Sequence, residues 1–524
     1  MKLVRFKLIS GPNLGILQGF DYAFYPSTLD STTTGPQCWV GDNGSGKSQL
    51  LQRLAEAFYC LDQYLEEGRR ETGKDAFEFE LEYLIEVDGK PAHVILRNQK
   101  PELRPRVFLR DKEGEREVQD RREIERHLPT RVVGYTSGEN ETLSVPFLDV
   151  RQEYATAVAE MANVPPANQT TVADTRLVMT DYNSNIAILV ANYLLRKQKE
   201  LAWFLRFIRV KSLHSFRIII QLNPKDGPSG GVRLTEELKG YLDALTKCAT
   251  CFDHSQAEDA YVLDFFVTNE TKKAFQRHFG SASTGSSHST AALNLYSTFT
   301  KFEMLNDLVI KKEHRQMINK LRKEQKIVIK PPAAPEASKV FRFQSVRLSL
   351  ADSPEILDYI SLSDGEHQFA HIFGTLMMFD QSNILFLLDE PEAHFNPKWR
   401  SKFISMFSKI MKGRRHCTVL TSHAPFVLSD SRRDDVFIFR RKGDAVKIDK
   451  PQVETYGTAF DKLLAEAFDV EPPISAQSRE AIQRLQKSDN IDTLQSKVRQ
   501  FGDSVEKFFV FQRIEELKAK KARK

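Results

Sequence analysis

The stretch Gly41-Asp42-Asn43-Gly44-Ser45-Gly46-Lys47-Ser48 decides the fold, because it follows the pattern G-x-x-x-x-G-K-[ST] of a phosphate-binding loop. The apolar residues Cys38-Trp39-Val40 precede it, and an amphipathic segment, 49–58, follows it. A phosphate-binding loop needs a strand before it and a helix after it, and the flanking residues predict both. The alternative is an ordinary glycine-rich turn before a helix, and the flanks argue against it.

The predicted loop is suited to the phosphates of ATP. Its glycines let successive backbone N–H groups turn inward, and the start of the following helix favours negative charge. We expect Lys47 to reach the β- and γ-phosphates and the Ser48 hydroxyl to bind Mg²⁺. The residues predicted to contact the nucleotide are Asn43, Gly44, Ser45, Gly46, Lys47, Ser48 and Gln49.

Two carboxylates, Asp389 and Glu390, end the apolar run 384–388. Such a run is typical of a buried parallel strand, whose carboxyl end is where ligands bind in an open α/β sheet. Asp389 is suited to hold Mg²⁺ through water. Glu390, one residue further on, can point at the γ-phosphate and polarise an attacking water.

A second apolar strand, 417–420, leads into Thr421-Ser422-His423-Ala424-Pro425. A histidine after a strand is often incidental. At this distance behind a carboxylate pair, we favour a histidine that contacts the γ-phosphate, and we assign that role to His423.

The segment Leu362-Ser363-Asp364-Gly365-Glu366 opens a predicted helix that includes residues 369–379. Ser363 is a natural N-cap, and Glu366 lies three residues on, in the capping-box position. The segment is therefore either a simple helix cap or a second helix N-terminus that offers N–H groups to a phosphate. Its place just before the carboxylate strand favours the second interpretation.

These four motifs, in this order, resemble those of the ABC-type ATPases. They are most similar to the non-transporter branch, which includes the RecF/SMC/Rad50-like and overcoming-lysogenisation-defect (OLD) families. LSDGE departs from the usual LSGGQ, and acidic variants of this kind are similar to those of the non-transporter branch. The resemblance implies an α/β ATPase head in which a parallel-sheet core carries the phosphate loop and an antiparallel β subdomain lies beside it.

The resemblance also implies a head-to-tail dimer of two ATPase heads. Ser363 and Gly365 would then contact ATP bound to Lys47 of the other protomer, and Glu366 belongs to the same predicted surface. Glu390 would be the catalytic base and His423 the switch histidine, while Ser48 and Asp389 would hold Mg²⁺. The family has a metal-contacting glutamine after the strand predicted at 131–135. This sequence has none there, and Ser137 and Glu139 are weak substitutes.

At 524 residues the chain is long enough for two to four structural units. We expect an N-terminal ATPase lobe at 1–150, with antiparallel hairpins around 77–96 and 110–114. A mostly helical insertion is expected at 151–338, with a long helix at 186–210 and a polar loop at 280–287. A C-terminal ATPase lobe is expected at 339–450 and a helical tail at 451–524.

The net charge of +5, from 75 basic and 70 acidic residues, is too small to indicate nucleic-acid binding by itself. Two local patches could track a phosphate backbone: a basic and aromatic stretch at 196–217, and a lysine-rich stretch at 311–330. Either one could equally be a solvated helix face. We expect the lysines at the C-terminus to form a solvated tail. No apolar run reaches the ~20 residues of a membrane helix, and the N-terminus lacks the apolar core of a signal peptide, so a cytoplasmic location is expected.

The five cysteines are scattered, which suits a reducing compartment. Cys248 and Cys251, with His254 nearby, have the spacing of metal ligands. A structural zinc site normally needs a second ligand pair, and no other cysteine is near in the sequence. The pair is either part of a zinc site or, as we favour, simply two thiols.

The full layout most resembles the ATPases of restriction-associated and antiphage operons, and above all the PtuA family of Septu and Septu-like retron systems. This resemblance implies a partner HNH nuclease of the PtuB type and, in retron systems, a reverse transcriptase with its RNA-linked DNA. The first functional hypothesis is therefore an ATPase that regulates a nuclease. The second is a RecF- or SMC-like ATPase that clamps DNA in repair. A transporter ATPase subunit is disfavoured by the large insertion and the missing glutamine.

Overall fold

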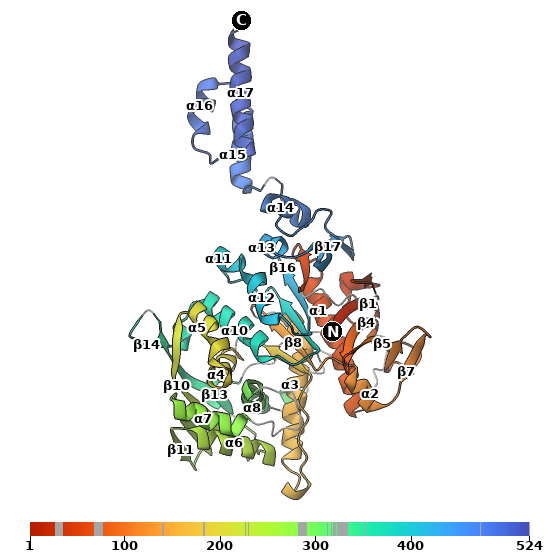
Figure 1. Cartoon of the computed structure of the whole chain (residues 1–524), viewed down its shortest axis with the longest axis vertical. Helices are drawn as coiled ribbons and strands as arrows, with labels where there is room; N and C mark the ends of the chain where they lie inside the picture. Colours follow the sequence, from red (N-terminus) through yellow and green to blue (C-terminus); the bar gives the residue numbers. More distant parts are fainter. Residues whose placement is uncertain are drawn as a thin grey trace.

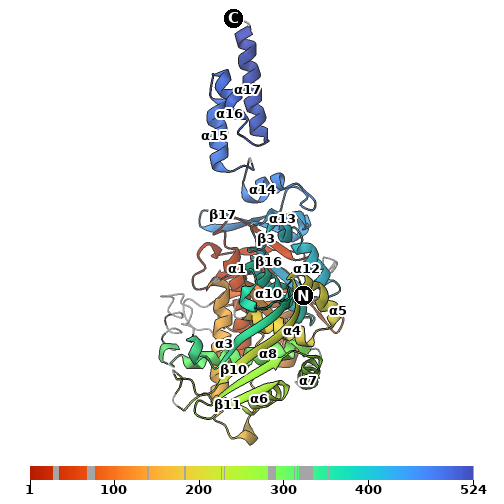
Figure 2. The ribbon, with the colours of Figure 1, turned by 90° about the vertical axis from the view of Figure 1, so that its left-hand side faces the viewer.

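The computed structural model describes residues 1–26, 35–67, 77–138, 141–181, 184–225, 227–228, 230–280, 291–311, 313–315, 317, 321, 334–351, 353–471 and 473–522. The described chain forms a body of sheets and helices from which the C-terminal helices project along the longest axis (Figures 1 and 2). Several stretches named above lie outside these residues. They are Glu139, most of the loop at 280–287, most of the lysine-rich stretch at 311–330, and the last two residues.

A seven-stranded sheet forms the centre of the described structure, with the strand order β18-β17-β3-β16-β15-β8-β9. All neighbouring strands are parallel except β18, which pairs antiparallel with β17. β3, β15 and β16 are buried along their whole length, as expected for the middle of a parallel sheet covered on both faces. The strands are β3 (Gln37–Gly41), β8 (Arg131–Thr136), β9 (Leu177–Thr180), β15 (Ile384–Asp389), β16 (Cys417–Ser422), β17 (Val436–Lys442) and β18 (Ala445–Asp449).

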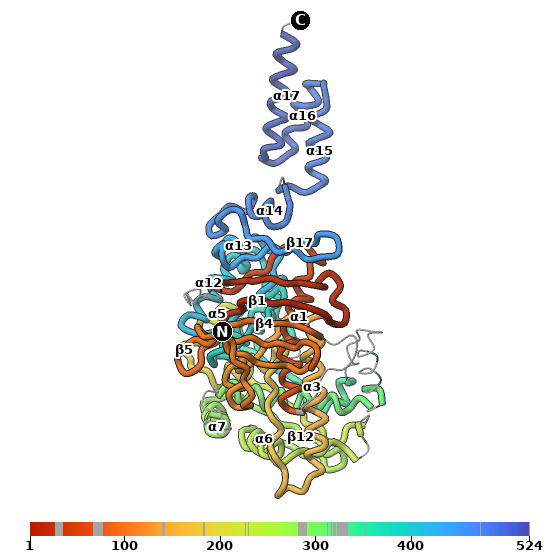
Figure 3. The backbone as a smooth tube through the Cα atoms, turned by 90° about the vertical axis from the view of Figure 1, so that its right-hand side faces the viewer, coloured from red at the N-terminus to blue at the C-terminus, as the bar shows by residue number. Residues whose placement is uncertain are grey.

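A six-stranded antiparallel sheet from the N-terminal part of the chain lies beside the central sheet, and Figure 3 shows its strands β1, β4 and β5. Helix α1 (Lys47–Glu67) links the two sheets through its apolar face, since Leu50, Leu54 and Phe58 share one core with Trp39 and Tyr83. Burying a side chain of this size contributes about 2 kcal/mol each. The strands are β1 (Lys2–Ser10), β2 (Asp21–Ala23), β4 (Glu78–Val87), β5 (Lys90–Asn98), β6 (Pro105–Arg110) and β7 (Glu115–Val118).

The segment expected to be a mostly helical insertion also contributes strands to a five-stranded antiparallel sheet of the described chain, in the order β11-β12-β10-β13-β14. Strand β10 pairs with β13, so this sheet crosses the boundary that we expected at 338. The expectation was incomplete here, because Phe216, Ile218 and Ile220 alternate inward against the helices that cover the sheet. The strands are β10 (Val210–Gln221), β11 (Cys251–Ser255), β12 (Ala260–Phe266), β13 (Phe341–Leu350) and β14 (Ile356–Asp358).

The prediction of one long helix at 186–210 is wrong. The chain forms two helices there, α4 (Asn185–Leu195) and α5 (Gln198–Phe207). The backbone is extended at Arg196 and Lys197, and Arg196 pairs with Asp380. The break turns Trp203 and Phe207 of α5 onto helix α10 (Asp364–Met378), where they contact Phe369.

The other helices complete the layers around the sheets and form the C-terminal projection. In the latter, α15, α16 and α17 share a small core made by Ile482, Leu485, Leu494, Val498, Val510 and Ile514. The helical tail is therefore ordered as a small bundle. The α-helices not yet given are α2 (Arg121–Arg126), α3 (Glu141–Met161), α6 (Glu236–Cys248), α7 (Asn269–Phe279), α8 (Ala291–Met304), α11 (Pro397–Arg400), α12 (Phe403–Met411), α13 (Pro425–Ser429), α14 (Phe460–Phe468), α15 (Ala476–Gln486), α16 (Ile491–Val498) and α17 (Val505–Ala522).

The predicted fold class, an α/β head with a parallel core, an antiparallel β subdomain and a helical C-terminal segment, is confirmed. Within the described ranges, none of the helices combines the length and the apolar character needed to cross a membrane.

Candidate functional site

The predicted site residues meet at the carboxyl ends of the central strands. The phosphate loop leaves β3, the Asp389–Glu390 pair ends β15, and β16 lies between these strands and leads to His423. Gly41, Gly44 and Gly46 have φ of 133°, 74° and 92°, which side-chain-bearing residues rarely adopt. A Cβ on Gly41 would overlap the carbonyl oxygen of Phe439 on β17. The strand–loop–helix geometry predicted from the motif is therefore present.

Lys47 is buried at the start of α1, and its ammonium group closes the loop. Its Nζ donates to the carbonyl oxygens of Gly41 and Asp42 at 2.9 and 2.8 Å, and to Ser45 Oγ at 3.2 Å. Burial lowers the pKa of Lys47 to about 8, against the opposing effect of Glu390 and Asp389. The lysine thus remains mostly charged at neutral pH and can exchange these loop carbonyls for phosphate oxygens.

Asp389 collects two hydroxyl donors on one carboxylate oxygen. Ser48 Oγ donates to Asp389 Oδ1 at 2.9 Å, and Thr421 Oγ1 donates to the same atom at 2.6 Å. Burial raises the pKa of Asp389, while these two hydroxyl groups oppose the rise. Hydroxyl and carboxylate oxygens are the ligands that Mg²⁺ prefers, so Ser48 and Asp389 fit the predicted metal site.

Glu390 and His423 form the second pair in this site. His423 Nε2 lies 3.2 Å from Glu390 Oε1, and the Glu390 backbone N–H donates to Thr421 Oγ1 at 3.0 Å. Glu390 has a φ of 48°, so its backbone is held in the left-handed region where β15 ends. The hydrogen bond from His423 lowers the pKa of Glu390, which keeps the carboxyl ionised.

Three residues to which the sequence analysis assigned no role connect the two halves of the site: Thr421, Ser422 and Glu392. Ser422 Oγ donates to Glu392 Oε1 and accepts from the Ala424 backbone N–H at 2.9 Å. Glu392 is buried, and its Oε2 has no hydrogen-bond partner among the described residues. Burial raises the pKa of Glu392 to about 7. The residues on either side, Pro391 and Ala393, do not indicate that the Glu392 side chain is buried, because its burial depends on contacts with distant parts of the chain.

We expect Glu392→Gln to stabilise the protein at alkaline pH. Because the pKa of Glu392 is higher in the folded chain than in the unfolded chain, ionisation of Glu392 opposes folding increasingly as pH rises from the unfolded pKa, 4.5, through the folded pKa, about 7. Glutamine removes this cost, which is about 3 kcal/mol at pH 8 and falls below about 1 kcal/mol at pH 5. Urea unfolding of both chains at pH 5 and pH 8 measures it. An equal difference at the two pH values would mean that Glu392 does not titrate as described.

The segment 362–366 caps helix α10, as predicted. Ser363 Oγ accepts from the Glu366 backbone N–H at 3.4 Å, and Glu366 Oε2 accepts from the Ser363 backbone N–H at 2.9 Å. Glu366 Oε1 also accepts from Arg209 Nε at 3.0 Å. In this conformation the two oxygens of Glu366 therefore bind groups of the chain itself, whereas Ser363 is exposed.

The structure separates the predicted residues into two groups. The residues of loop 41–48 lie with Asp389, Glu390 and His423. Ser363, Gly365 and Glu366 form a second surface, and no hydrogen bond or ion pair between described atoms joins it to the loop. Asn43, Gly44 and Gln49 are exposed at the loop and at the first turn of α1. The contacts of all these residues with a nucleotide stay predictions.

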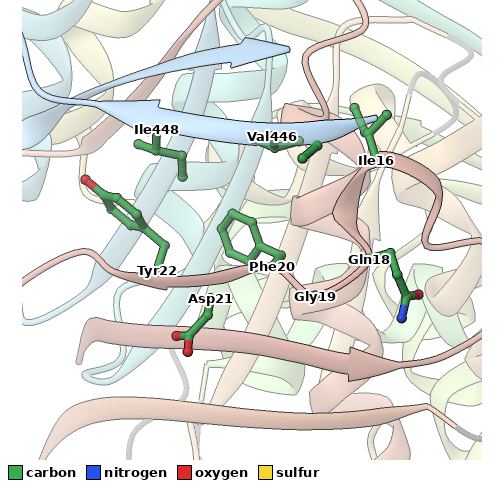
Figure 4. Close-up of a pocket in the computed structure, with 9 residues that line it drawn as sticks. Ile16, Gln18, Gly19, Phe20, Asp21, Tyr22, Val446 and Ile448 are labelled. Carbon is green, nitrogen blue, oxygen red and sulfur yellow. The ribbon is translucent and has the colours of Figure 1, made fainter. Parts of the chain in front are cut away.

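A pocket of about 180 Å³ lies behind the phosphate loop. In Figure 4, Phe20, Tyr22, Val446 and Ile448 lie around a common space between the N-terminal segment and β18, and Asp21 points away from it. The pocket adjoins the loop directly, since a Cβ on Gly46 would lie 2.9 Å from Val446 and 3.2 Å from Ile16.

Two alternatives that the sequence left open, a zinc site at Cys248 and Cys251 and a metal contact by Ser137, receive no further support. Cys248 is buried at the end of α6, Cys251 is exposed on β11, and His254 lies 2.9 Å from Asp259. Across the described ranges, no cluster of three or more His, Cys, Asp or Glu side chains could hold a metal ion. Ser137 follows β8, and its carbonyl oxygen lies 3.0 Å from His394 Nε2, so its described contact is to the chain itself.

A comparison with protein-family models matches residues 253–429 to the family described as "AAA domain, putative AbiEii toxin, Type IV TA system". The matched segment includes the α10 cap, the carboxylate pair and His423. This part of the chain is similar to an ATPase domain of that type. The match does not reach the phosphate-binding loop at 41–48.

Among curated proteins, the chain is similar to protein ea59 of Escherichia phage lambda, with 31% identity over 84 residues. This match spans 16% of this chain and 16% of the phage protein. Among solved structures, it is similar to the SMC head domain from Thermotoga maritima, at 11% identity and a TM-score of 0.33, over 86% of this chain and 100% of that one. A Smc head with an extended coiled coil from Pyrococcus furiosus, bound to the C-terminal domain of ScpA, matches at 11% identity and a TM-score of 0.33, over 86% and 96%.

Proposed function

We propose that the chain is an ATPase that works as a head-to-tail dimer and regulates a partner nuclease in antiphage defence. One observation carries the ATPase part of the proposal. Five side chains from three strand ends meet in one site and supply the chemical groups that phosphoryl transfer to water requires. They are Lys47, Ser48, Asp389, Glu390 and His423.

In this proposal, the backbone N–H groups of the loop and Lys47 bind the β- and γ-phosphates of ATP. Ser48 and Asp389 hold Mg²⁺, which neutralises charge on the phosphates when bound. Glu390 accepts a proton from the attacking water, and His423 holds the Glu390 carboxylate in place through the contact at 3.2 Å. Thr421 fixes the positions of both carboxylate residues, because it donates to Asp389 and accepts from the Glu390 backbone.

The exposed cap of α10 supports a dimeric site. Ser363 and the preceding Ile360 both face solvent, and 74% of Ile360 is exposed, which is unusual for a large apolar side chain beside a helix cap. A second head bound there would cover Ile360 and bring its own phosphate loop to Ser363 and Gly365. In this arrangement each ATP is held by Lys47 of one protomer and by the α10 cap of the other.

We assign the pocket behind Gly46 to the base of the nucleotide, because its walls include the rings of Phe20 and Tyr22 beside polar groups and it adjoins the phosphate loop. Ile448→Trp should fill this pocket and weaken ATP binding by about tenfold, a loss of about 1.4 kcal/mol. Binding of inorganic triphosphate, which has no base, should not change. Isothermal titration with both ligands tests this expectation.

Lys447→Trp is the matched control for that experiment, because successive residues of β18 point to opposite faces and Lys447 is not among the pocket residues. Equal losses of ATP affinity in the two variants, or an equal loss of triphosphate binding in Ile448→Trp, would remove the base from this pocket.

The role in defence rests on the resemblance of the full layout to the ATPases of antiphage operons. The description of the matched family, a putative toxin of a toxin–antitoxin system, is in keeping with it. The partner that we propose is an HNH nuclease of the PtuB type, with a reverse transcriptase and RNA-linked DNA if the operon encodes a retron. Purification of the tagged chain from cells that carry its native operon, followed by mass spectrometry and nucleic-acid extraction, tests this. Recovery of the chain with bulk DNA alone would favour the repair-type clamp instead.

The alternative DNA-clamp function receives less support from the stretch 196–217. Its aromatic residues Trp203, Phe204 and Phe207 pack towards α10 and are not arranged as a stacking surface for bases. Its basic residues Lys197, Lys199 and Arg206 remain exposed, as on an ordinary solvated helix face.

A further inference from the structure

The cap of helix α10 contains a charge pair that the proposed hydrolysis does not use. Glu366 Oε2 accepts from both the backbone N–H and the hydroxyl group of Ser363, each at 2.9 Å. Glu366 Oε1 lies 3.0 Å from Arg209 Nε and 2.9 Å from Arg209 Nη2. One carboxylate therefore joins an arginine to the serine that we assign to the nucleotide of the second protomer.

Arg209 belongs to the segment inserted between the two ATPase lobes. It lies at the corner between α5 and β10, with a φ of 55°. Its carbonyl oxygen accepts from the Ala351 backbone N–H, next to the end of β13, at 2.8 Å. Phe207, two residues earlier, stacks on Phe369 of α10 with ring centres 4.4 Å apart. The five-stranded sheet and this aromatic contact thus hold the guanidinium group at the α10 cap.

The cap has an electrostatic problem if it is to receive phosphates. Two carboxylates, Asp364 and Glu366, lie in the first turn of α10. They favour the helix itself, because its N-terminus carries partial positive charge, but they repel an approaching polyphosphate. The LSGGQ signature of the resembling family has neutral residues at these two positions. In this chain, some other group must offset the added negative charge.

Arg209 is placed to offset it. The Arg209 side chain is 64% exposed, whereas that of Glu366 is 6% exposed, so the guanidinium group covers the buried carboxylate from the solvent side. Arg209 Nη1 has no hydrogen-bond partner among the described residues, so part of the guanidinium fork still faces outward beside Ser363. Arginine remains charged at all relevant pH values and binds phosphate as readily as carboxylate.

We propose that Arg209 is a positioning residue of the dimeric site. It neutralises Glu366 and so makes the acidic α10 cap acceptable to the terminal phosphates of ATP carried by a second copy of this chain. This inference rests on the proposed ATP-dependent dimer. Since the inserted sheet and the Phe207–Phe369 contact hold Arg209, the insertion contributes to the dimeric site through this side chain.

The test uses the full chain with Glu390→Gln, so that ATP is not consumed, and measures the dimer dissociation constant by sedimentation equilibrium with ATP and Mg²⁺. Arg209→Gln should raise this constant at least about tenfold, because a carboxylate beside the phosphates is left uncompensated. Arg209→Lys keeps the charge and should stay within about threefold of the parent. The effect of Arg209→Gln should shrink as salt is raised from about 0.05 to about 0.5 M, because salt screens the repulsion between the carboxylate and the phosphates.

The decisive variant is the double substitution Arg209→Gln with Glu366→Gln. Glutamine still completes the capping box but carries no charge, so dimer formation should return to within about threefold of the parent. If the double variant is as weak as Arg209→Gln, Arg209 acts only through packing and the inference is wrong. It is also wrong if Arg209→Gln dimerises like the parent. Thermal unfolding checks that each variant is folded. If Arg209→Gln does not fold, Glu366→Gln alone still tests the inference, because it should dimerise at least as tightly as the parent.

The same samples separate this inference from the proposed function. Binding of a fluorescent ATP analogue to each monomer at low protein concentration reports on the phosphate loop alone. A parent chain that binds no ATP refutes the proposed ATPase itself. A parent that binds ATP but stays monomeric overturns both the dimer and the role of Arg209. A parent that dimerises with ATP, but is indifferent to Arg209, overturns only the inference.

Discussion

Glu390→Gln should lower the ATP turnover number by about 10²- to 10⁴-fold, the usual contribution of a general base. Glutamine keeps the size of the side chain but cannot accept the proton of the attacking water. The substitution leaves unchanged the groups proposed to bind ATP and Mg²⁺, which are the loop N–H groups, Lys47, Ser48 and Asp389. ATP affinity should therefore stay within about threefold of the native value, which is below 1 kcal/mol. Phosphate release and equilibrium ATP binding, measured on the same preparation, check the two halves of this prediction.

His423→Ala is the companion to that variant, because His423 Nε2 holds Glu390 Oε1 at 3.2 Å. It should slow turnover less than Glu390→Gln does, since the base itself remains. The hydrogen bond from His423 also lowers the pKa of Glu390, so removing it should move the acidic limb of the pH–rate profile to higher pH. A Glu390→Gln chain that hydrolyses ATP at the native rate would exclude Glu390 as the base.

Lys47→Ala should weaken ATP binding by about 10- to 100-fold, because a hydrogen bond from a charged group is worth about 1.5–3 kcal/mol. The lysine is already directed into the loop, where it donates to Gly41, Asp42 and Ser45. The substitution therefore removes both a group proposed to bind phosphate and three hydrogen bonds within the loop. Titration calorimetry with ATP gives the affinity, and thermal unfolding gives the cost to the loop.

Lys450→Ala is a matched control for Lys47→Ala. Lys450 is another lysine whose pKa burial lowers to about 8, and its Nζ donates to the carbonyl oxygen of Val436 at 3.2 Å. It should lose stability without losing ATP affinity. Unchanged ATP affinity in Lys47→Ala, or the same loss in both variants, would contradict the assignment of the phosphate loop.

The parts of the site that could be predicted from the sequence are those fixed by local chemistry. A glycine pattern between a strand and a helix specifies the loop at 41–48, and an apolar run that ends in two carboxylates specifies the end of β15. The meeting of these elements with His423 follows from the rule that parallel strands bring their carboxyl ends to one edge. Ser363 and Glu366 could be identified as a cap because the capping box is a contact between near neighbours.

The parts that could not be predicted depend on contacts between distant residues. The pairing of β10 with β13 joins segments separated by more than a hundred residues, and nothing local announces it. The break between α4 and α5 comes from the pairing of Arg196 with Asp380 and the packing of α5 on α10. Thr421, Glu392 and Arg209 gain their roles in the same way, because each acts on a residue far away in the chain or on another strand.

The most direct test of the central claim is sedimentation velocity of the Glu390→Gln chain with and without ATP and Mg²⁺. The claim is that two copies share each nucleotide, so the chain should sediment as a dimer with ATP and should shift towards monomer without it. Glu390→Gln combined with Ser363→Arg, which places a bulky side chain on the exposed α10 cap, should bind ATP and yet remain monomeric. A Glu390→Gln chain that stays monomeric while saturated with ATP, or that dimerises equally well with Ser363→Arg, would contradict the shared site.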